Sequence, residues 1–124
     1  MGGLTFDTGM LISLERRRQR ASRVFAVAVD AGARITVPVV VVGEWWRGRT
    51  DAREDLLAAV DVEPMSVTLA RLAGEALAQV RGATLVDAVV MASAAQRGDV
   101  VYTSDPADLE KLRAHFPAVR VLSA

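Results

Sequence analysis

The chain has 124 residues, enough for one domain that buries roughly two thirds of the surface its unfolded state would expose. Its 52% hydrophobic and 24% charged residues are typical of a folded globular protein and exclude a disordered chain. Because 15 basic residues balance 15 acidic ones, any nucleic acid would have to be bound through local basic patches.

Cysteine is absent, which excludes disulfides, zinc–thiolate sites and cysteine nucleophiles. The only histidine is His115, so a multi-histidine metal site is excluded as well. No apolar run approaches the ~18 residues of a membrane span, and Met1-Gly2-Gly3 lacks the basic start of a signal peptide. We therefore expect a cytoplasmic protein without a membrane segment.

The first half of the chain is predicted to alternate between strands and helices. Asp7 can cap a helix after a short apolar strand, and Gly32 ends the second helix. The valine-rich run after Pro38 favours a strand by propensity, but Pro38 suits a helix start, so a helix is predicted. The predicted elements are strand 4–6, helix 8–16, helix 19–31, strand 34–37, helix 38–48 and helix 50–60.

The second half continues the alternation. Ser66 opens the clearest helix, whose apolar residues recur at helical spacing until Gly82 closes it. The predicted elements are an extended segment or strand 62–65, helix 66–82, helix 84–98, strand 100–103, helix 105–116 and strand 119–122. Strands separated by helices indicate one α/β domain over residues 1–124, with a mainly parallel central sheet of four to five strands flanked by helices.

Three isolated acids are expected at one edge of this sheet. Asp7 follows the first strand and Asp105 follows the strand 100–103, and the carboxyl ends of parallel strands share an edge. Asp87 lies in the first turn of the helix that leads into strand 100–103, so it starts from the same edge. Glu44 lies about two turns into the helix after the second strand, so its side chain either reaches this edge or lies away from it.

Each acid also has a purely structural explanation. Asp7 and Asp105 can be helix N-caps, Asp87 can belong to a capping box with Thr84, and Glu44 can be a solvated helix residue. Gathered together, however, two carboxylates about 4 Å apart repel by about 4 kcal/mol at an effective dielectric near 20. A domain stable by roughly 5–15 kcal/mol needs protons or a counter-ion to hold several such pairs. An all-carboxylate site selects Mg²⁺ or Mn²⁺, and these ions serve phosphoryl chemistry.

The order of these acids and their neighbours resembles PIN-domain proteins, and among them the VapC toxins of bacterial toxin–antitoxin pairs. The residues that resemble the family are Leu4-Thr5-Phe6-Asp7-Thr8, Glu44, Val86-Asp87-Ala88 and Thr103-Ser104-Asp105-Pro106-Ala107-Asp108. The resemblance covers the whole chain. It implies a three-layer PIN-like domain and an endoribonuclease that uses Mg²⁺ or Mn²⁺, forms a homodimer and is kept inactive by a VapB-type antitoxin.

Carried over to this chain, the family's acidic quartet corresponds to Asp7, Glu44, Asp87 and Asp105. Asp108 matches a further acid, so that the metal ligands implied by the resemblance are Asp7, Asp87, Asp105 and Asp108. The expected reaction is in-line attack of water on an RNA phosphodiester, with Glu44 orienting the metal or its water.

Thr8 and Thr103 match the hydroxyl residues that support the family's acids. The chain departs from the family at Gly9, where serine is frequent, and in the valine-rich lead into Glu44.

Arginines near these acids are candidate RNA contacts: Arg47 and Arg49 just beyond Glu44, and Arg17 in the charged segment 15–20. Arg53, Arg16, Arg18, Arg20 and Arg23 belong to the same two groups. Of Trp45 and Trp46, one is expected in the core and the other at a base or a partner, while His115 is expected to be structural.

Three alternatives remain open. A non-catalytic PIN-like binding module would share the fold and lack activity. A phospho-acceptor receiver domain would need a lysine after its last-but-one strand, but the only lysine, Lys111, lies inside the last predicted helix. A phosphatase of the haloacid dehalogenase type would need an aspartate two residues after Asp7, where Gly9 stands.

Overall fold

The computed structural model describes residues 2–124. Its centre is a sheet of five parallel strands in the order β3-β2-β1-β4-β5. The strands are β1 (Leu4–Phe6), β2 (Ile35–Pro38), β3 (Asp61–Glu63), β4 (Val100–Thr103) and β5 (Arg120–Ser123). The predicted α/β fold with a parallel sheet is thus confirmed. Of the two alternatives for residues 62–65, the strand is correct, and it covers Asp61–Glu63.

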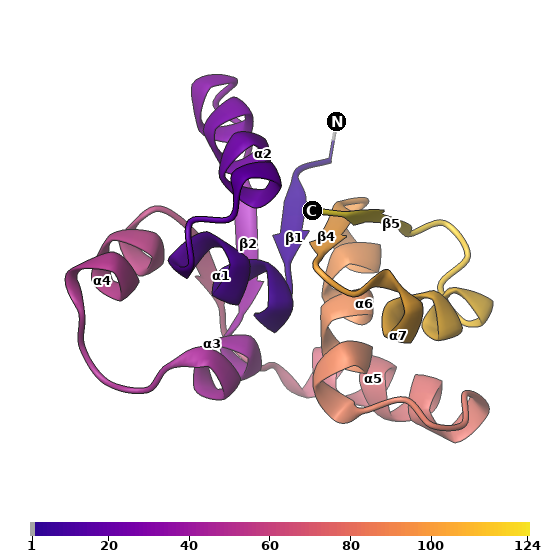
Figure 1. The fold of residues 1–124 in the computed structure, drawn as a ribbon. Coiled ribbons are helices and arrows are strands. Elements are labelled where there is room, and N and C mark those ends of the chain that lie inside the picture. The colour runs from indigo at the N-terminus through magenta and orange to yellow at the C-terminus, as the bar shows by residue number, and fades with distance from the viewer. Residues whose placement is uncertain (1) are drawn as a thin grey trace.

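Helices cover both faces of this sheet, which gives three layers. They are α1 (Thr8–Glu15), α2 (Gln19–Asp30), α3 (Val39–Trp45), α4 (Asp51–Ala58), α5 (Val67–Gln79), α6 (Leu85–Arg97) and α7 (Pro106–Glu110), with a 3₁₀ turn η1 (Lys111–Ala114). Figure 1 shows α1 to α4 gathered on one side and α5, α6 and α7 on the other. Within residues 2–124, no helix is long and apolar enough to cross a membrane.

Local side-chain caps explain where four of the helices begin. The side-chain oxygens of Asp7, Thr50, Ser66 and Thr84 each accept a hydrogen bond from the backbone N–H three residues further on. Such caps satisfy amide groups that the first turn of a helix leaves without partners. Gly98 ends α6 in the left-handed conformation, with φ 71°. These boundaries confirm the signals seen in the sequence.

Two helices are shorter than predicted. Pro38 is the last residue of β2 and precedes α3, which ends at Trp45 and not near Gly48. The φ of −61° that the proline ring imposes is combined here with an extended ψ of 143°, so Pro38 completes the strand before the helix starts. Helix α5 ends at Gln79, ahead of Gly82, which lies in the following turn.

The prediction of one helix over 105–116 is wrong, because the segment divides into α7 and η1. Leu109 and Leu112 are both fully buried, and a 3₁₀ turn aligns side chains three residues apart. Asp105 precedes α7, but its side chain makes no capping hydrogen bond. In α2 only Ala21 and Ala28 are buried, and Val27 is 64% exposed although its helix is amphipathic in sequence.

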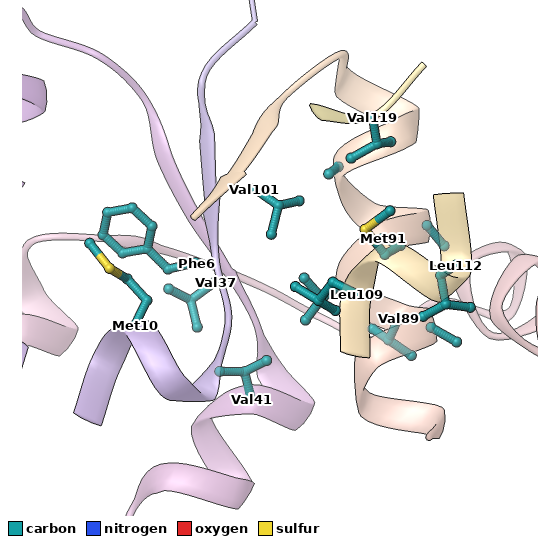
Figure 2. Packing of buried hydrophobic residues seen from close by; sticks show 14 of the residues in the cluster. Phe6, Met10, Val37, Val41, Val89, Met91, Val101, Leu109, Leu112 and Val119 are labelled. Carbon is teal, nitrogen blue, oxygen red and sulfur yellow. The ribbon is translucent and has the colours of Figure 1, made fainter. Parts of the chain in front are cut away.

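The core lies on both faces of the sheet. Figure 2 shows Phe6, Met10 and Val37 together on the α1 side, and Met91, Leu109, Leu112 and Val119 together on the side of α6 and α7. Phe6 packs against Phe25 of α2, with ring centroids 6.4 Å apart. On the other face α6 is the central element, because all of residues 88–94 are buried. It packs against α5, α7 and the sheet.

A polar network joins the end of α6 to the sheet. Arg97 forms ion pairs with Glu63 (2.8 Å) and Asp99 (2.9 Å), and its guanidinium also donates to the hydroxyls of Thr5 and Ser93. Asp99 accepts a further hydrogen bond from the Thr5 hydroxyl at 2.8 Å. Because each charged group in this largely buried network has a partner, Arg97 fixes α6 against β1 and β3.

Candidate active site

Asp7 lies where β1 ends and α1 begins. One carboxylate oxygen, Oδ1, accepts the Met10 backbone N–H at 2.9 Å as the cap of α1. The other, Oδ2, accepts the Thr103 hydroxyl at 2.6 Å from the end of the neighbouring strand β4. The residue is only 8% exposed. The parallel sheet and the helix cap therefore orient this carboxylate at the carboxyl edge of the sheet.

The pKa of Asp7 is raised from 3.8 to about 6. Burial is the main cause, because it removes the carboxylate from water. The negative charge of Asp87 raises the pKa further, whereas the hydrogen bonds from Thr103 and Met10 lower it. The two donors thus leave part of the cost of a buried negative charge uncompensated.

Asp87 lies in the first turn of α6, and several neighbouring charges affect its pKa. Burial is the main cause that raises its pKa, and the negative charges of Asp108 and Glu44 raise it further. The Thr84 hydroxyl and the ammonium group of Lys111 act in the opposite direction. Acids of α3 and α7 thus raise the pKa of Asp87, and Asp87 in turn raises the pKa of Asp7, which precedes α1. This agrees with helices that meet at one edge of the sheet.

Glu44 reaches this edge through α1. Its Oε1 accepts a hydrogen bond from the Thr8 hydroxyl at 2.5 Å, and Thr8 directly follows Asp7. Helices α1 and α3 pack together, so the exposed Glu44 carboxylate is held beside the first turn of α1. Thr8 therefore orients Glu44, and Thr103 orients Asp7.

Asp105 and Asp108 are placed differently. The Asp105 backbone N–H donates to the Thr103 hydroxyl at 3.1 Å, and its carboxylate is exposed. Asp108, also exposed, raises the pKa of Asp87 and accepts a hydrogen bond from Lys111 at 3.3 Å. The charge of Asp108 therefore reaches the first turn of α6 from α7.

The donor atoms of this edge suit a hard cation in kind, because all of them are carboxylate oxygens. Asp7 is buried and Asp87 half-buried, and both have raised pKa values, so a divalent charge would relieve most repulsion at this pair. Across residues 2–124, no three acids stand in an arrangement that could hold one ion. The pair is therefore the part of the expected ligand set that fits a metal.

Two features of the site were missed in the sequence. Lys111 pairs with Asp108, and the spacing of three residues within a helical segment is the signal that could have indicated it. The second feature is Ser104: a Cβ on Gly9 would lie 2.3 Å from the Ser104 Oγ and 3.6 Å from Asp7 Oδ1. The Ser104 side chain therefore occupies the space beside Asp7 into which a residue-9 side chain would point.

The arginines proposed as RNA contacts lie in different settings. Arg47 donates to the carbonyl oxygens of Gly43 and Trp46 and lines a hollow with Glu44. Arg49 is exposed and has only a loose ion pair, 3.8 Å from Glu54. Arg17 is exposed in the turn before α2, with φ 56°.

The two tryptophans have separate environments. Trp45 is a core residue, as one of the two was expected to be, and its indole N–H donates to Glu15 at 2.9 Å. Trp46 is partly exposed and packs edge-on against Trp45. His115 packs against Phe116 with centroids 4.9 Å apart, away from the acids' hydrogen bonds.

The family model of the PIN domain matches residues 4–114, and the chain belongs to this family. PIN domains are generally nucleases that use divalent metal ions. The match excludes the receiver-domain and dehalogenase alternatives. Among curated proteins, none matches the chain.

Solved structures of the same fold come from toxin–antitoxin complexes. VapBC2 from Rickettsia felis, bound to a promoter DNA fragment, has a TM-score of 0.76 at 10% identity and covers 98% of each chain. DNA-bound VapBC from Salmonella typhimurium has a TM-score of 0.73 at 18% identity, with 99% of this chain and 98% of that one covered. A toxin–antitoxin complex from Klebsiella pneumoniae has a TM-score of 0.71 at 20% identity, with 97% of this chain and 96% of that one covered. At these identities the likeness concerns the fold.

Proposed function

We propose that this protein is a Mg²⁺- or Mn²⁺-dependent endoribonuclease and the toxin of a VapBC-type pair. The observation that carries the proposal is the buried Asp7 beside Asp87, two carboxylates with raised pKa values at the carboxyl edge of a PIN-domain sheet. Two carboxylates that repel each other do not stabilise the fold. We therefore infer that the pair binds a cation.

In this proposal Asp7 and Asp87 are the central metal ligands, and Asp108 and Asp105 complete the set from the start of α7. The bound ion supplies a Lewis acid that activates water and neutralises the phosphodiester. Thr103 keeps Asp7 aimed through its 2.6 Å hydrogen bond, and Thr8 positions Glu44 at 2.5 Å. Glu44 would orient the attacking water by accepting a hydrogen bond from it at the oxygen that Thr8 does not occupy.

The proposed partners follow from the same class of protein. Matching folds in VapBC and FitAB structures support a VapB-type antitoxin, and we propose a homodimer in a cytoplasmic setting. RNA would approach the acids past Arg47, with Arg49 and Arg17 as further contacts. Arg47 is the best placed of the three, because it shares a hollow with Glu44.

The test is Mg²⁺- or Mn²⁺-dependent cleavage of total RNA by the wild type and by Asp87→Asn. We expect Asp87→Asn to lose cleavage and to keep its thermal stability, because only a charge at a repulsive site is removed. Asp55→Asn, an exposed acid on α4, serves as the matched control and should cleave like the wild type. Equal cleavage by the Asp87 variant and the wild type would refute the role of Asp87.

A second candidate function is a non-catalytic PIN-like binding module. It is favoured by one observation, that no three acids among residues 2–124 are arranged to hold one ion. Titration with Mn²⁺ separates the two functions. A wild-type protein that binds no Mn²⁺ and cleaves no RNA would be the binding module.

A further inference from the structure

Beside the acids, the surface of the protein has a hollow of about 620 Å³ that the mechanism above does not use. We call it the elbow hollow, because it lies between α1 and the turn that leads into α2. Its lining includes Gly9 and Ser13 of α1, Ser104 after β4, and the arginines Arg16, Arg18 and Arg20. A volume of this size is in the range of small-ligand sites and holds a nucleotide.

The elbow hollow begins at the acids. Gly9 is the residue that connects them, since it lines the hollow while its missing side chain would contact Asp7 Oδ1 at 3.6 Å. From there α1 runs about two turns, or roughly 12 Å, to the arginines at its other end. No acid lines the hollow, but its Gly9 end therefore lies next to Asp7, and its other end is basic.

The arginines of the elbow hollow lack carboxylate partners. Among the described residues, no ion pair of 4 Å or less involves Arg16, Arg18 or Arg20. All three are exposed. Their charges are thus available to an anion, and the nearby hydroxyl of Ser104 can donate to the same ligand.

The hollow on the other side of α1 is different. It is smaller, about 240 Å³, and two carboxylates line it, Glu15 and Glu44, whereas none lines the elbow hollow. Glu15 already pairs with Arg53 at 3.0 Å. Trp45 lines this smaller hollow but is only 4% exposed, so no base can stack on its face. Size and charge therefore favour the elbow hollow as the place for a polyanion.

We propose that the elbow hollow holds the strand of single-stranded RNA next to the scissile phosphodiester, with Arg18 and Arg20 bound to its backbone phosphates. This inference rests on the proposed ribonuclease function and names how its substrate is held. The strand needs such contacts, because acids near the cleaved bond repel its phosphates. Since Arg18 and Arg20 lie away from the acids, they act on binding and not on the chemical step.

Two arginines elsewhere on the surface offer a matched control. Arg71 and Arg120 are exposed, form no ion pair of 4 Å or less among the described residues, and do not line the elbow hollow. The double variants Arg18→Gln/Arg20→Gln and Arg71→Gln/Arg120→Gln therefore carry the same net charge and differ in whether the lost arginines line the hollow. Circular dichroism and thermal melting establish that both are folded.

The experiment measures binding of a fluorescein-labelled 10-nucleotide single-stranded RNA by anisotropy in EDTA, over a series of salt concentrations. Arg18→Gln/Arg20→Gln should bind at least about tenfold more weakly, and the slope of log affinity against log salt should fall by roughly 1.4 for two lost phosphate contacts. Arg71→Gln/Arg120→Gln should change affinity less than about threefold. In cleavage assays the Arg18→Gln/Arg20→Gln variant should raise KM and leave kcat unchanged.

Equal losses in the two double variants would overturn the proposal, because they would show a general effect of charge. Unchanged RNA binding by Arg18→Gln/Arg20→Gln would also overturn it, including when that variant loses binding to a partner protein. Since binding is measured in EDTA, the proposed nuclease function can fail separately. A wild type that cleaves no RNA, but binds it through Arg18 and Arg20, would refute catalysis and support the hollow.

Discussion

Asp7 is held by two donors, the Met10 backbone N–H and the Thr103 hydroxyl, and still has a pKa of about 6. Its unfolded-state value is near 3.8, so the folded protein binds the proton more tightly than the unfolded chain. The stability that comes from protonated Asp7 is present at low pH and is lost as the pH rises from about 3.8 through 6. At neutral pH the ionised group costs about 3 kcal/mol.

The first prediction at the residue scale is that Asp7→Asn stabilises the metal-free protein at pH 7.5, by about 1–3 kcal/mol. Asparagine removes the charge but keeps the cap to Met10 and a hydrogen bond with Thr103. Near pH 3.5 both forms are neutral and the two proteins should be equally stable. Urea unfolding in EDTA at both pH values measures the difference.

Two controls accompany this prediction. Mg²⁺ should stabilise the wild type and leave Asp7→Asn unchanged, because a ligand of the native state alone raises the free energy of unfolding. Asp99→Asn should instead lower the free energy of unfolding, because that buried carboxylate is paired with Arg97 at 2.9 Å. An Asp7→Asn variant less stable than the wild type at pH 7.5 would mean that ionised Asp7 supports the fold.

Among the helices, α6 is one whose start and end are both determined by nearby residues. Thr84 caps it, and Gly98 closes it with φ 71°. A residue with a Cβ is strained in this left-handed conformation. Gly74 is the contrasting glycine: it lies inside α5, and a Cβ added to it would meet nothing within 4 Å.

We therefore predict opposite effects for the same substitution. Gly98→Ala should lower the free energy of unfolding by about 1–2 kcal/mol, through strain at the end of α6. Gly74→Ala should raise it by about 0.5–1 kcal/mol, because alanine loses less backbone entropy in a helix. Urea unfolding of the two variants measures both, and a Gly98→Ala variant as stable as the wild type would contradict the assigned conformation.

The elements that sequence predicted correctly are those with local signals. Asp7, Ser66 and Thr84 mark helix starts through hydrogen bonds that span only three residues. The break between α7 and η1 depends instead on the burial of Leu109 and Leu112 against α6, which no local pattern encodes. Continuous helix was predicted there for that reason.

In the candidate site, too, the sequence predicted some features, and others depend on tertiary packing. The parallel topology places Asp7 and Asp87 at one edge, and the charge that Asp87 exerts on the pKa of Asp7 agrees with this. Topology does not tell how the two acids of the α7 segment are placed. Asp105 precedes the helix, with φ −135° and ψ 88°, while Asp108 lies in the helix and raises the pKa of Asp87. The pairing of Glu44 with Thr8 spans 36 residues and depends on how α3 packs on α1.

On the scale of the whole molecule, α6 separates two polar centres. Asp87 in its first turn belongs to the acids, while Arg97 in its last turn joins Asp99, just before β4, to Glu63 at the end of β3. Ten residues of helix put about 15 Å between them. The first centre has uncompensated negative charge, and in the second every charge is paired. We therefore expect the first to determine activity and the second to determine stability.

The final prediction tests this separation with Arg97→Met. Methionine retains much of the apolar length but leaves Asp99, which is 5% exposed, and Glu63 without their cation. Breaking a buried pair in this way should cost about 3–5 kcal/mol, a large part of the roughly 5–15 kcal/mol of a small domain. Urea unfolding should show the loss, whereas kcat per folded molecule at low temperature should stay near the wild-type value.

A triple variant supplies the control, because Arg97→Met with Glu63→Gln and Asp99→Asn removes all three charges together. It should recover part of the lost stability, since it leaves no buried charge unpaired. If Arg97→Met were instead within about 1 kcal/mol of the wild type, the network would be a solvated surface cluster. If it lowered kcat as Asp87→Asn is expected to, the two ends of α6 would be coupled, and the division between a stabilising centre and a catalytic centre would not hold.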